Sequence, residues 1–254
     1  MSCVARARTS GIRRRTPQKK WLGPQSTDDR SALAQRRLIA TGSAVALFVL
    51  AGITANPLRA QVVHTIQPQV AVAIAARPLT PFAGAADADV TIIEFLDYNC
   101  PFCKKSAPEL QKLLQADRRV RILYKEWPIF GDVSEYAARS ALAANWQAKF
   151  LAVHNALISA PEDLDEKSQV DSLLKGIGVD LKRLADDRTR HATEIDAALA
   201  RNAAEAKALG LRGTPGFLVG RQLLPTALTL QQLVQLTAEA RTSQQVDGKA
   251  GANP

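Results

Sequence analysis

The chain alternates between short continuous apolar runs and longer stretches in which apolar residues recur every three or four positions. Residues 90–98 (VTIIEFLDY) are β-branched, aromatic and apolar on both faces except at Glu94, which predicts a central strand covered on both sides. Residues 119–127 (RVRILYKEW) predict a second strand. Between them a helix is expected to begin after Cys100, because Pro101 suits the first helical position. This order predicts a βαβ unit with a parallel pair of strands.

The apolar period is helical over residues 132–209, and three to five helices are expected there. Residues 214–225 (TPGFLVGRQLLP) predict two short strands in a hairpin, and residues 229–240 (TLQQLVQLTAEA) predict an amphipathic closing helix. The predicted class is therefore α/β, with a helical insertion at about 131–210 inside a domain that spans 82–241. A sheet interrupted in this way can still close around one core.

The N-terminal residues differ in composition from the rest. Residues 1–37 hold ten of the 33 Lys and Arg residues but two of the 24 Asp and Glu residues, so most of the net charge of +9 belongs to this basic leader. The remainder is close to neutral, which argues against a nucleic-acid-binding domain. Residues 38–55 carry no charge and suit a transmembrane anchor or a signal segment, and Arg36-Arg37 before them resembles a twin-arginine signal.

The remaining boundaries follow from charge and proline content. The positive-inside rule keeps the leader in the cytoplasm and sends the rest of the chain across the membrane. Residues 56–81 contain four prolines among small residues and predict an extended linker. Residues 242–254 predict a flexible polar tail.

Two of the three cysteines, Cys100 and Cys103, form a C-x-x-C pair, whereas Cys3 lies in the leader. At a helix N-terminus Cys100 faces unpaired main-chain N–H groups and the positive end of the helix dipole, and Lys104 and Lys105 add charge nearby. These groups favour the thiolate and predict a pKa below the ordinary value of about 8.5. Cys103 lies one turn later, within reach of a disulfide. Cys100 is therefore predicted as the exposed, attacking thiol and Cys103 as the buried, resolving thiol.

Three interpretations of the pair stay open: a redox-active dithiol, a structural disulfide and a metal site. Zinc prefers four ligands, and the chain has no second cysteine pair. His64, His154 and His191 are scattered without a ligand-like spacing. Two thiolates suffice for copper(I), which accepts soft ligands at low coordination number.

Glu94 and the Thr214-Pro215 dipeptide are further candidates. Strand alternation places Glu94 on the face of Leu96, inside the protein, where a carboxylate is costly. An edge position or a salt bridge with Lys125 is the structural alternative. Thr214-Pro215 lies between two glycines before a strand, and taken alone it predicts an ordinary trans-proline turn, because most X-Pro bonds are trans.

Large aromatic side chains could also line a peptide groove, but in such segments they more often fill the core. Trp127, Phe130 and Trp146 are accordingly predicted to be core residues.

Three segments together resemble a known family: the strand ending in EFLDYNCPFC, the following helix with its internal Pro108, and GTPGFLVG before a hairpin. They are similar to the DsbA-like thiol:disulfide oxidoreductases, which have a thioredoxin fold with an inserted helical domain. The resemblance covers about residues 80–240. FLDYNCPFCKKSAPEL with KEWPIFG is most similar to the Com1/ScsC-like branch.

The resemblance implies roles for individual residues. Glu94 would help proton transfer at the buried thiol, and Thr214, before a cis Pro215, would face the cysteines and pair with the substrate chain. The residues implied to be catalytic are Cys100, Cys103 and Glu94; those implied to bind substrate are Thr214 and Pro215; those implied to modulate the site are Pro101, Phe102 and Lys104.

The implied activity is disulfide exchange with cysteines of other exported proteins, without a cofactor or metal, and with a membrane redox partner that recycles the dithiol. The implied location is the bacterial inner membrane with the catalytic domain in the periplasm, or the periplasm alone after cleavage. Phe102 stands where DsbA oxidases usually carry His, and Thr214 is more typical of isomerases and reductases, so the direction of exchange stays open. The alternative is a copper(I)-binding, metal-tolerance protein without turnover.

Overall fold

The computed structural model describes residues 64–250 of the chain. The predicted leader 1–37 and the predicted transmembrane or signal segment 38–55 lie outside the described residues. No helix within 64–250 combines the length and the hydropathy needed to cross a membrane.

A six-stranded sheet of order β1-β6-β5-β3-β4-β2 forms the centre of the fold. Its strands are β1 His64–Thr65, β2 Phe82–Gly84, β3 Val90–Leu96, β4 Val120–Glu126, β5 Gly216–Val219 and β6 Gln222–Leu224. Strands β3 and β4 are parallel and every other pair is antiparallel. The predicted βαβ unit and the predicted hairpin are therefore confirmed.

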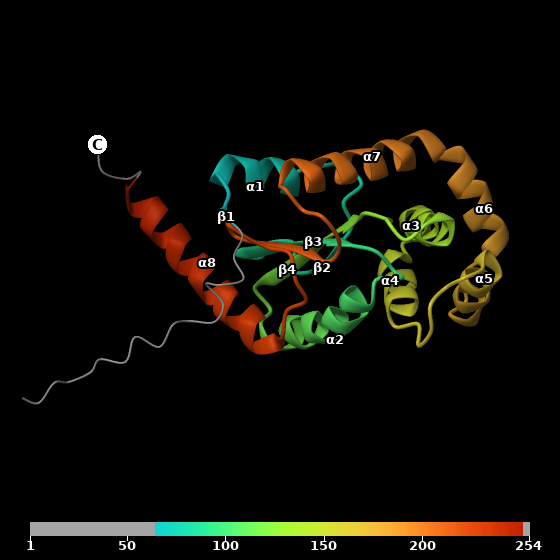
Figure 1. Cartoon of the computed structure of the whole chain (residues 1–254), viewed down its shortest axis with the longest axis horizontal. Helices are drawn as coiled ribbons and strands as arrows, with labels where there is room; N and C mark the ends of the chain where they lie inside the picture. The colour runs from blue at the N-terminus through green and yellow to red at the C-terminus, as the bar shows by residue number, and fades with distance from the viewer. Residues whose placement is uncertain (1–63, 251–254) are drawn as a thin grey trace, which may run out of the picture. The chain divides into compact units, whose positions relative to one another are not determined.

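Helices cover both faces of the sheet, and α3 to α6 gather at one end of it (Figure 1). The bounds are α1 Pro68–Ala75, α2 Pro101–Ala116, α3 Asp132–Ala143, α4 Phe150–Ile158, α5 Lys167–Gly176, α6 Leu181–Arg190, α7 Ala192–Ala208 and α8 Leu230–Ala250, with a 3-10 turn at Ala144–Gln147. Helices α1 and α7 lie over one face, and α2 and α8 lie over the other (Figure 1).

Each face of the sheet has its own core because side chains of a strand point alternately to opposite faces. On β3, Ile92 and Leu96 join the larger core, which continues into the helical group, and Ile93 and Phe95 join the smaller core under α1 and α7. The end of α7 contributes Ala206 to that smaller core. Only part of the predicted insertion is therefore separate from the sheet, because its last helix, α7, packs on the sheet.

The prediction of an extended linker is wrong for the part of 56–81 that the structure describes. Strand β1 pairs with β6, and α1 follows it directly. Ile66 and Ile74 are buried against the sheet, so this segment contributes to the core. Pro68 fits because it occupies the first turn of α1, where its missing N–H costs no helical hydrogen bond.

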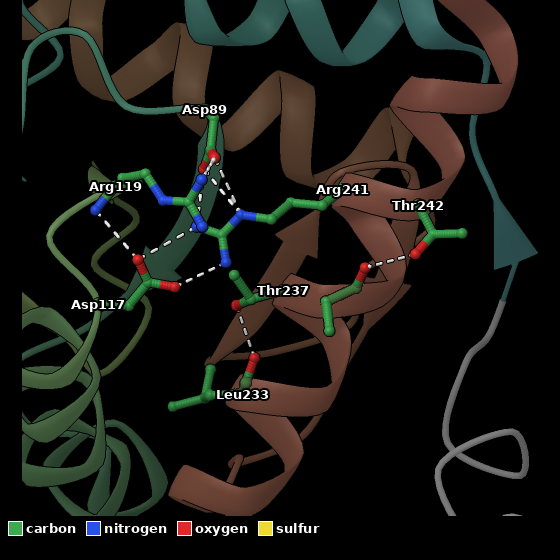
Figure 2. A network of polar contacts seen from close by, with 8 residues as sticks. Asp89, Asp117, Arg119, Leu233, Thr237, Arg241 and Thr242 are labelled. Atoms are coloured by element: carbon green, nitrogen blue, oxygen red, sulfur yellow. Dashed lines mark hydrogen bonds and ion pairs between the residues drawn. The ribbon is translucent and has the colours of Figure 1, made fainter.

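The prediction of a flexible tail is wrong for residues 242–250, where α8 continues. Figure 2 shows how the middle of this helix is fixed: the Arg241 guanidinium binds Asp89, before β3, and Asp117, after α2, each with a contact of 2.7 Å. The guanidinium holds the pKa of both carboxyls below their ordinary values. The Thr242 hydroxyl also donates to the main-chain oxygen of Ala238 in the preceding turn.

Candidate active site

Cys100 lies where the chain leaves β3 and enters α2. It is the N-cap residue of the helix in an extended conformation, with Pro101 in the first turn, as predicted. Its main-chain oxygen accepts the N–H of Lys104 at 3.0 Å, and its own N–H donates to the Asp97 main-chain oxygen at 3.1 Å. One turn later, Cys103 points into the larger core.

The segment before β5 faces this helix start. The peptide bond between Thr214 and Pro215 is cis, as predicted. The Cys100 thiol donates to the main-chain oxygen of Thr214 across 3.1 Å. The two segments, 114 positions apart in the sequence, therefore meet at the sulfur of Cys100.

The prediction that Cys100 is exposed is wrong. Its exposed fraction is 1%, against 0% for Cys103. Contact with the Thr214 main chain buries the sulfur in addition to the helix that carries it. The two cysteines are not joined by a disulfide bond.

The surroundings nevertheless shift the pKa values of the two thiols in opposite directions. The pKa of Cys100 is lowered to about 6, first by a hydrogen bond from Cys103, against the effect of burial. Hydrogen bonding to Thr214 and to the main chain of Phe102 and Cys103 lowers it further, as the helix N-terminus predicts. Neither predicted lysine is among these causes, and the Lys104 ammonium donates instead to the main-chain oxygen of Glu162 at 2.7 Å.

Cys103 has the opposite tendency. Burial raises the pKa of Cys103, and the nearby Cys100 and Glu94 charges raise it further, while a main-chain hydrogen bond from Asp97 lowers it. Cys103 therefore keeps its proton and donates it in a hydrogen bond to the Cys100 thiolate.

Glu94 is buried on β3, with 2% of its surface exposed, and it lies on the face of the strand predicted for it. Burial, followed by the negative charge of Cys100, raises the pKa of Glu94 to about 8. The alternative salt bridge with Lys125 is not formed, because the Lys125 Nζ binds Glu205 Oε2 at 3.0 Å.

Sequence reasoning missed a cluster of buried polar side chains formed by Tyr98, Glu126 and His154. The Tyr98 hydroxyl donates to Glu126 Oε1 at 2.8 Å and lies 3.2 Å from His154 Nδ1. Burial raises the pKa of Glu126 and Tyr98 and lowers the pKa of His154 to about 3. The sequence signal was Glu126, the charged residue that ends β4. The cluster could not be predicted because Tyr98 lies 28 residues from Glu126 and 56 residues from His154 along the chain.

The aromatic side chains near the site differ in exposure. Trp127 is buried, as predicted, but Phe130 is 52% exposed, so the prediction of a core position is wrong for Phe130. Phe102, between the two cysteines, is also exposed. The difference in exposure has a local reason. The main-chain N–H of Trp127 donates to the Leu96 oxygen of β3, so Trp127 stays at the sheet, whereas Phe130 lies in the loop beyond it.

Among residues 64–250, no three or more His, Cys, Asp or Glu side chains converge in a way that could hold a metal ion.

The combination of a C-x-x-C pair at a helix N-terminus, a facing cis-proline and a parallel βαβ unit agrees with a comparison to known families. The DSBA-like thioredoxin domain matches residues 91–238, more than half of the chain. The chain belongs to this family. Its DSBA-like domain is of the thiol:disulfide oxidoreductase type.

Solved structures of similar proteins extend this assignment. A thioredoxin-like oxidoreductase from Silicibacter pomeroyi is 39% identical, with a TM-score of 0.63 over 65% of this chain and 94% of that chain. The catalytic domain of Proteus mirabilis ScsC is 27% identical, with a TM-score of 0.61 over 70% of this chain and 99% of that one. The thiol-disulfide exchange protein alpha-DsbA2 from Wolbachia pipientis is 26% identical, with a TM-score of 0.60 over 64% of this chain and 87% of that chain.

The curated relatives that match this chain are much longer proteins. The Na(+)/H(+) antiporter NhaA 3 of Salinispora tropica is 28% identical over 180 residues, which is 67% of this chain and 26% of that protein. NhaA 1 of Salinispora arenicola is 30% identical over 145 residues, or 54% of this chain and 21% of that protein. The chain thus spans about a quarter of the length of these relatives or less.

Proposed function

We propose that Cys100 is the exchanging thiol and that the pair oxidises cysteines of other exported proteins. The observation that carries this proposal is the lowered pKa of Cys100 opposite the Thr214 main chain. A thiolate stabilised in the reduced form makes the disulfide form a stronger electron acceptor.

The proposed exchange begins with the Cys100–Cys103 disulfide. A substrate thiolate attacks Cys100 Sγ, the bond to Cys103 breaks, and the electron pair passes to Cys103, which takes up a proton. A second substrate thiolate then attacks the substrate sulfur of the mixed disulfide, and Cys100 leaves as a thiolate. The substrate loses two electrons to form its disulfide, and the cysteine pair gains them.

Glu94 is proposed as the group that gives and takes the proton at Cys103. Its pKa of about 8 leaves it mostly protonated at pH 7, so it has a proton to give when Cys103 becomes the leaving thiolate. The electrostatic interaction between Glu94 and both cysteines supports this role.

Thr214 and Pro215 are proposed to bind the substrate chain, since the Thr214 oxygen already lies against Cys100. Pro101, Phe102 and Lys104 are proposed to modulate the site. Pro101 occupies the first turn of α2, where its missing N–H costs no helical hydrogen bond. The Phe102 ring, between the two cysteines, is exposed. Lys104 ties the active-site helix to the loop before α5.

The oxidising direction is proposed from how far the pKa of Cys100 is lowered. With a pKa of about 6, Cys100 at pH 7 gains about 1.4 kcal/mol of stability as a thiolate relative to an ordinary cysteine. That difference corresponds to about 30 mV of reduction potential in the oxidising direction. The Phe102 side chain has no hydrogen-bonding group, so it adds nothing to the stability of the Cys100 thiolate.

The proposed location is the outer side of a bacterial inner membrane. The basic leader and the uncharged segment 38–55 support export, with or without a retained anchor. A similar solved structure is a periplasmic thioredoxin-like protein from Salmonella enterica serovar Typhimurium, 27% identical to this chain. A membrane redox partner would reoxidise the pair after each turnover.

The reduction potential of the pair tests this proposal. Equilibration with glutathione at pH 7, followed by mass spectrometry, is expected to give a value more positive than about −220 mV, between those of glutaredoxins and DsbA. The control is Phe102→His, which is expected to shift the potential to a more positive value by adding a group that stabilises the Cys100 thiolate. A wild-type potential below about −270 mV, the value for thioredoxin, would contradict the oxidising direction.

A further inference from the structure

Asn99 precedes the reactive cysteine in the short turn between β3 and α2, and its side chain has no role in the exchange described so far. Two hydrogen bonds to Asp97 fix this turn internally. The Cys100 N–H donates to the main-chain oxygen of Asp97 at 3.1 Å, and the Asn99 N–H donates to Asp97 Oδ1 at 2.8 Å. Asparagine and aspartate favour turns because their side chains bond to nearby main-chain groups in this way.

The Asn99 side chain connects the turn to the loop between α4 and α5. Its Nδ2 donates to the main-chain oxygen of Leu164 at 2.9 Å, and its Oδ1 accepts the main-chain N–H of Leu164, also at 2.9 Å. The amide thus exchanges two hydrogen bonds with one residue 65 positions away, as paired β-strands do. An alanine or aspartate side chain cannot make both bonds, because both a donor and an acceptor are needed.

Leu164 is a fixed point for this attachment. Its side chain is 4% exposed and belongs to the larger core, together with both cysteines. A second contact holds the same loop, because the Lys104 ammonium donates to the main-chain oxygen of Glu162 at 2.7 Å and lies 3.3 Å from Asp163 Oδ1. The residues on either side of the cysteine pair, Asn99 and Lys104, therefore both bind this loop.

The position of the turn matters for the reactive sulfur. The pKa of Cys100 is lowered first by a hydrogen bond from Cys103, and the main chain of Phe102 and Cys103 also contributes. Those donors lie in the first turn of α2, whereas Cys100 is the N-cap residue, with a non-helical ψ of 116°. The alignment of the sulfur with the donors therefore depends on the turn before the helix. Hydrogen bonds weaken steeply as their angle departs from linear, so a displaced turn stabilises the thiolate less.

Replacing Asn99 by an uncharged residue leaves the charges around Cys100 unaltered. Glu94 on β3 and Cys103 on α2 both interact electrostatically with Cys100. On the side of the loop, the charge of Lys104 is paired with Asp163. The segment before β5 contributes the main-chain oxygen of Thr214, which carries no charge. A change in the ionisation of Cys100 in such a variant therefore reports a change in geometry.

We propose that Asn99 is a positioning residue: by binding both main-chain groups of Leu164 it holds the turn against the start of α2, and so keeps Cys100 in the thiolate form at neutral pH. Asn99 acts through the main chain of the turn and not through contact with the substrate. This inference rests on the proposed function, in which Cys100 is the exchanging thiol.

The test is the pH dependence of Cys100 alkylation by iodoacetamide in the reduced Asn99→Ala variant. The midpoint is expected to rise from near 6 in the wild type to about 7. One pKa unit is a tenfold change in the equilibrium between thiol and thiolate, which is within the range that two hydrogen bonds contribute. Alkylation at pH 6 is then expected to be about fivefold slower, because the thiolate fraction falls from about a half to about a tenth. The reduction potential of the pair is expected to become more negative.

Asn155→Ala is the matched control. Asn155 lies on α4, and its Oδ1 accepts from Gln111 Nε2 of α2 at 3.2 Å, so this variant removes an amide contact between the same parts of the fold without touching the turn. Its midpoint is expected to stay within about 0.2 pH units of wild type. Urea unfolding of both variants measures stability separately. A purely structural role of Asn99 would lower the stability and leave the midpoint unchanged, and that result would overturn the proposal.

Should Asn99→Ala fail to fold, Asn99→Ser decides. Serine is also favoured in turns and is uncharged, but its hydroxyl stands too close to the main chain to bind both groups of Leu164. The same rise in midpoint is expected, and an unchanged midpoint overturns the proposal. A wild-type midpoint between about 8 and 9 would overturn the proposed function as well. A wild-type midpoint near 6 that neither Asn99 variant changes overturns this inference alone.

Discussion

Cys100→Ser is expected to abolish disulfide exchange, lowering kcat/KM by at least about 10⁴-fold. The physical reason is that serine has no ionisable group near neutral pH and forms no disulfide with a substrate. The hydrogen bonds that lower the pKa of Cys100 would then stabilise no thiolate. The measurement is turnover of a reduced model protein in the presence of an excess of oxidant.

Cys103→Ser is the matched control for that variant. It keeps the attacking thiol but removes the thiol that resolves the mixed disulfide, so a covalent complex through Cys100 is expected to accumulate. Mass spectrometry of the trapped species identifies which sulfur carries the substrate. Accumulation on Cys103 in the Cys100→Ser variant, with continued turnover, would contradict the assignment.

Glu205→Ala is expected to reduce the free energy of unfolding by about 3 kcal/mol, because it leaves a buried charge without its partner. The Lys125 side chain has an exposed fraction of 0%, and its Nζ lies 3.0 Å from Glu205 Oε2. Burial lowers the pKa of Lys125, which shows that the surroundings disfavour its charge. The other Glu205 oxygen binds Arg77, so the substitution also removes one contact between α7 and the segment after α1. Urea unfolding monitored by circular dichroism measures the change.

The control for this prediction removes the charge that would be left behind. Lys125→Met has a similar volume, and combining it with Glu205→Ala is expected to recover at least half of the lost stability. If Glu205→Ala costs less than about 0.5 kcal/mol, or if the double variant recovers nothing, the buried pair does not hold β4 and α7 together as described.

The parts of the fold set by local patterns could be predicted from the sequence. The apolar run of β3 and the proline after Cys100 located the central strand and the start of α2 to within a few residues. Glu94 was placed on the correct face because strand alternation is regular. The cis peptide bond at Thr214-Pro215 was predicted through the resemblance to the family and not from the local pattern, and the structure confirms it.

The parts set by contacts between distant residues could not be predicted. The four prolines of residues 56–81 predict a linker where the structure has α1. The burial of Ile74 in that helix depends on a sheet assembled from later strands. The exposure of Cys100 depends on Thr214, 114 residues away. The Asp97 carboxylate likewise accepts from main-chain N–H groups 32 and 33 residues further along, those of Ile129 and Phe130, which no local pattern marks.

The most direct test of the account is the pH at which Cys100 ionises. The pKa of Cys100 in the folded protein is below the ordinary value of about 8.5. The thiolate therefore stabilises the reduced protein fully above about pH 8.5, and this stabilisation is lost as the pH falls through the folded pKa. The rate of alkylation of Cys100 by iodoacetamide, followed from pH 4 to 10 by mass spectrometry of the reduced protein, is expected to rise with a midpoint near 6. A midpoint between about 8 and 9, or faster alkylation of Cys103 than of Cys100, would contradict the account.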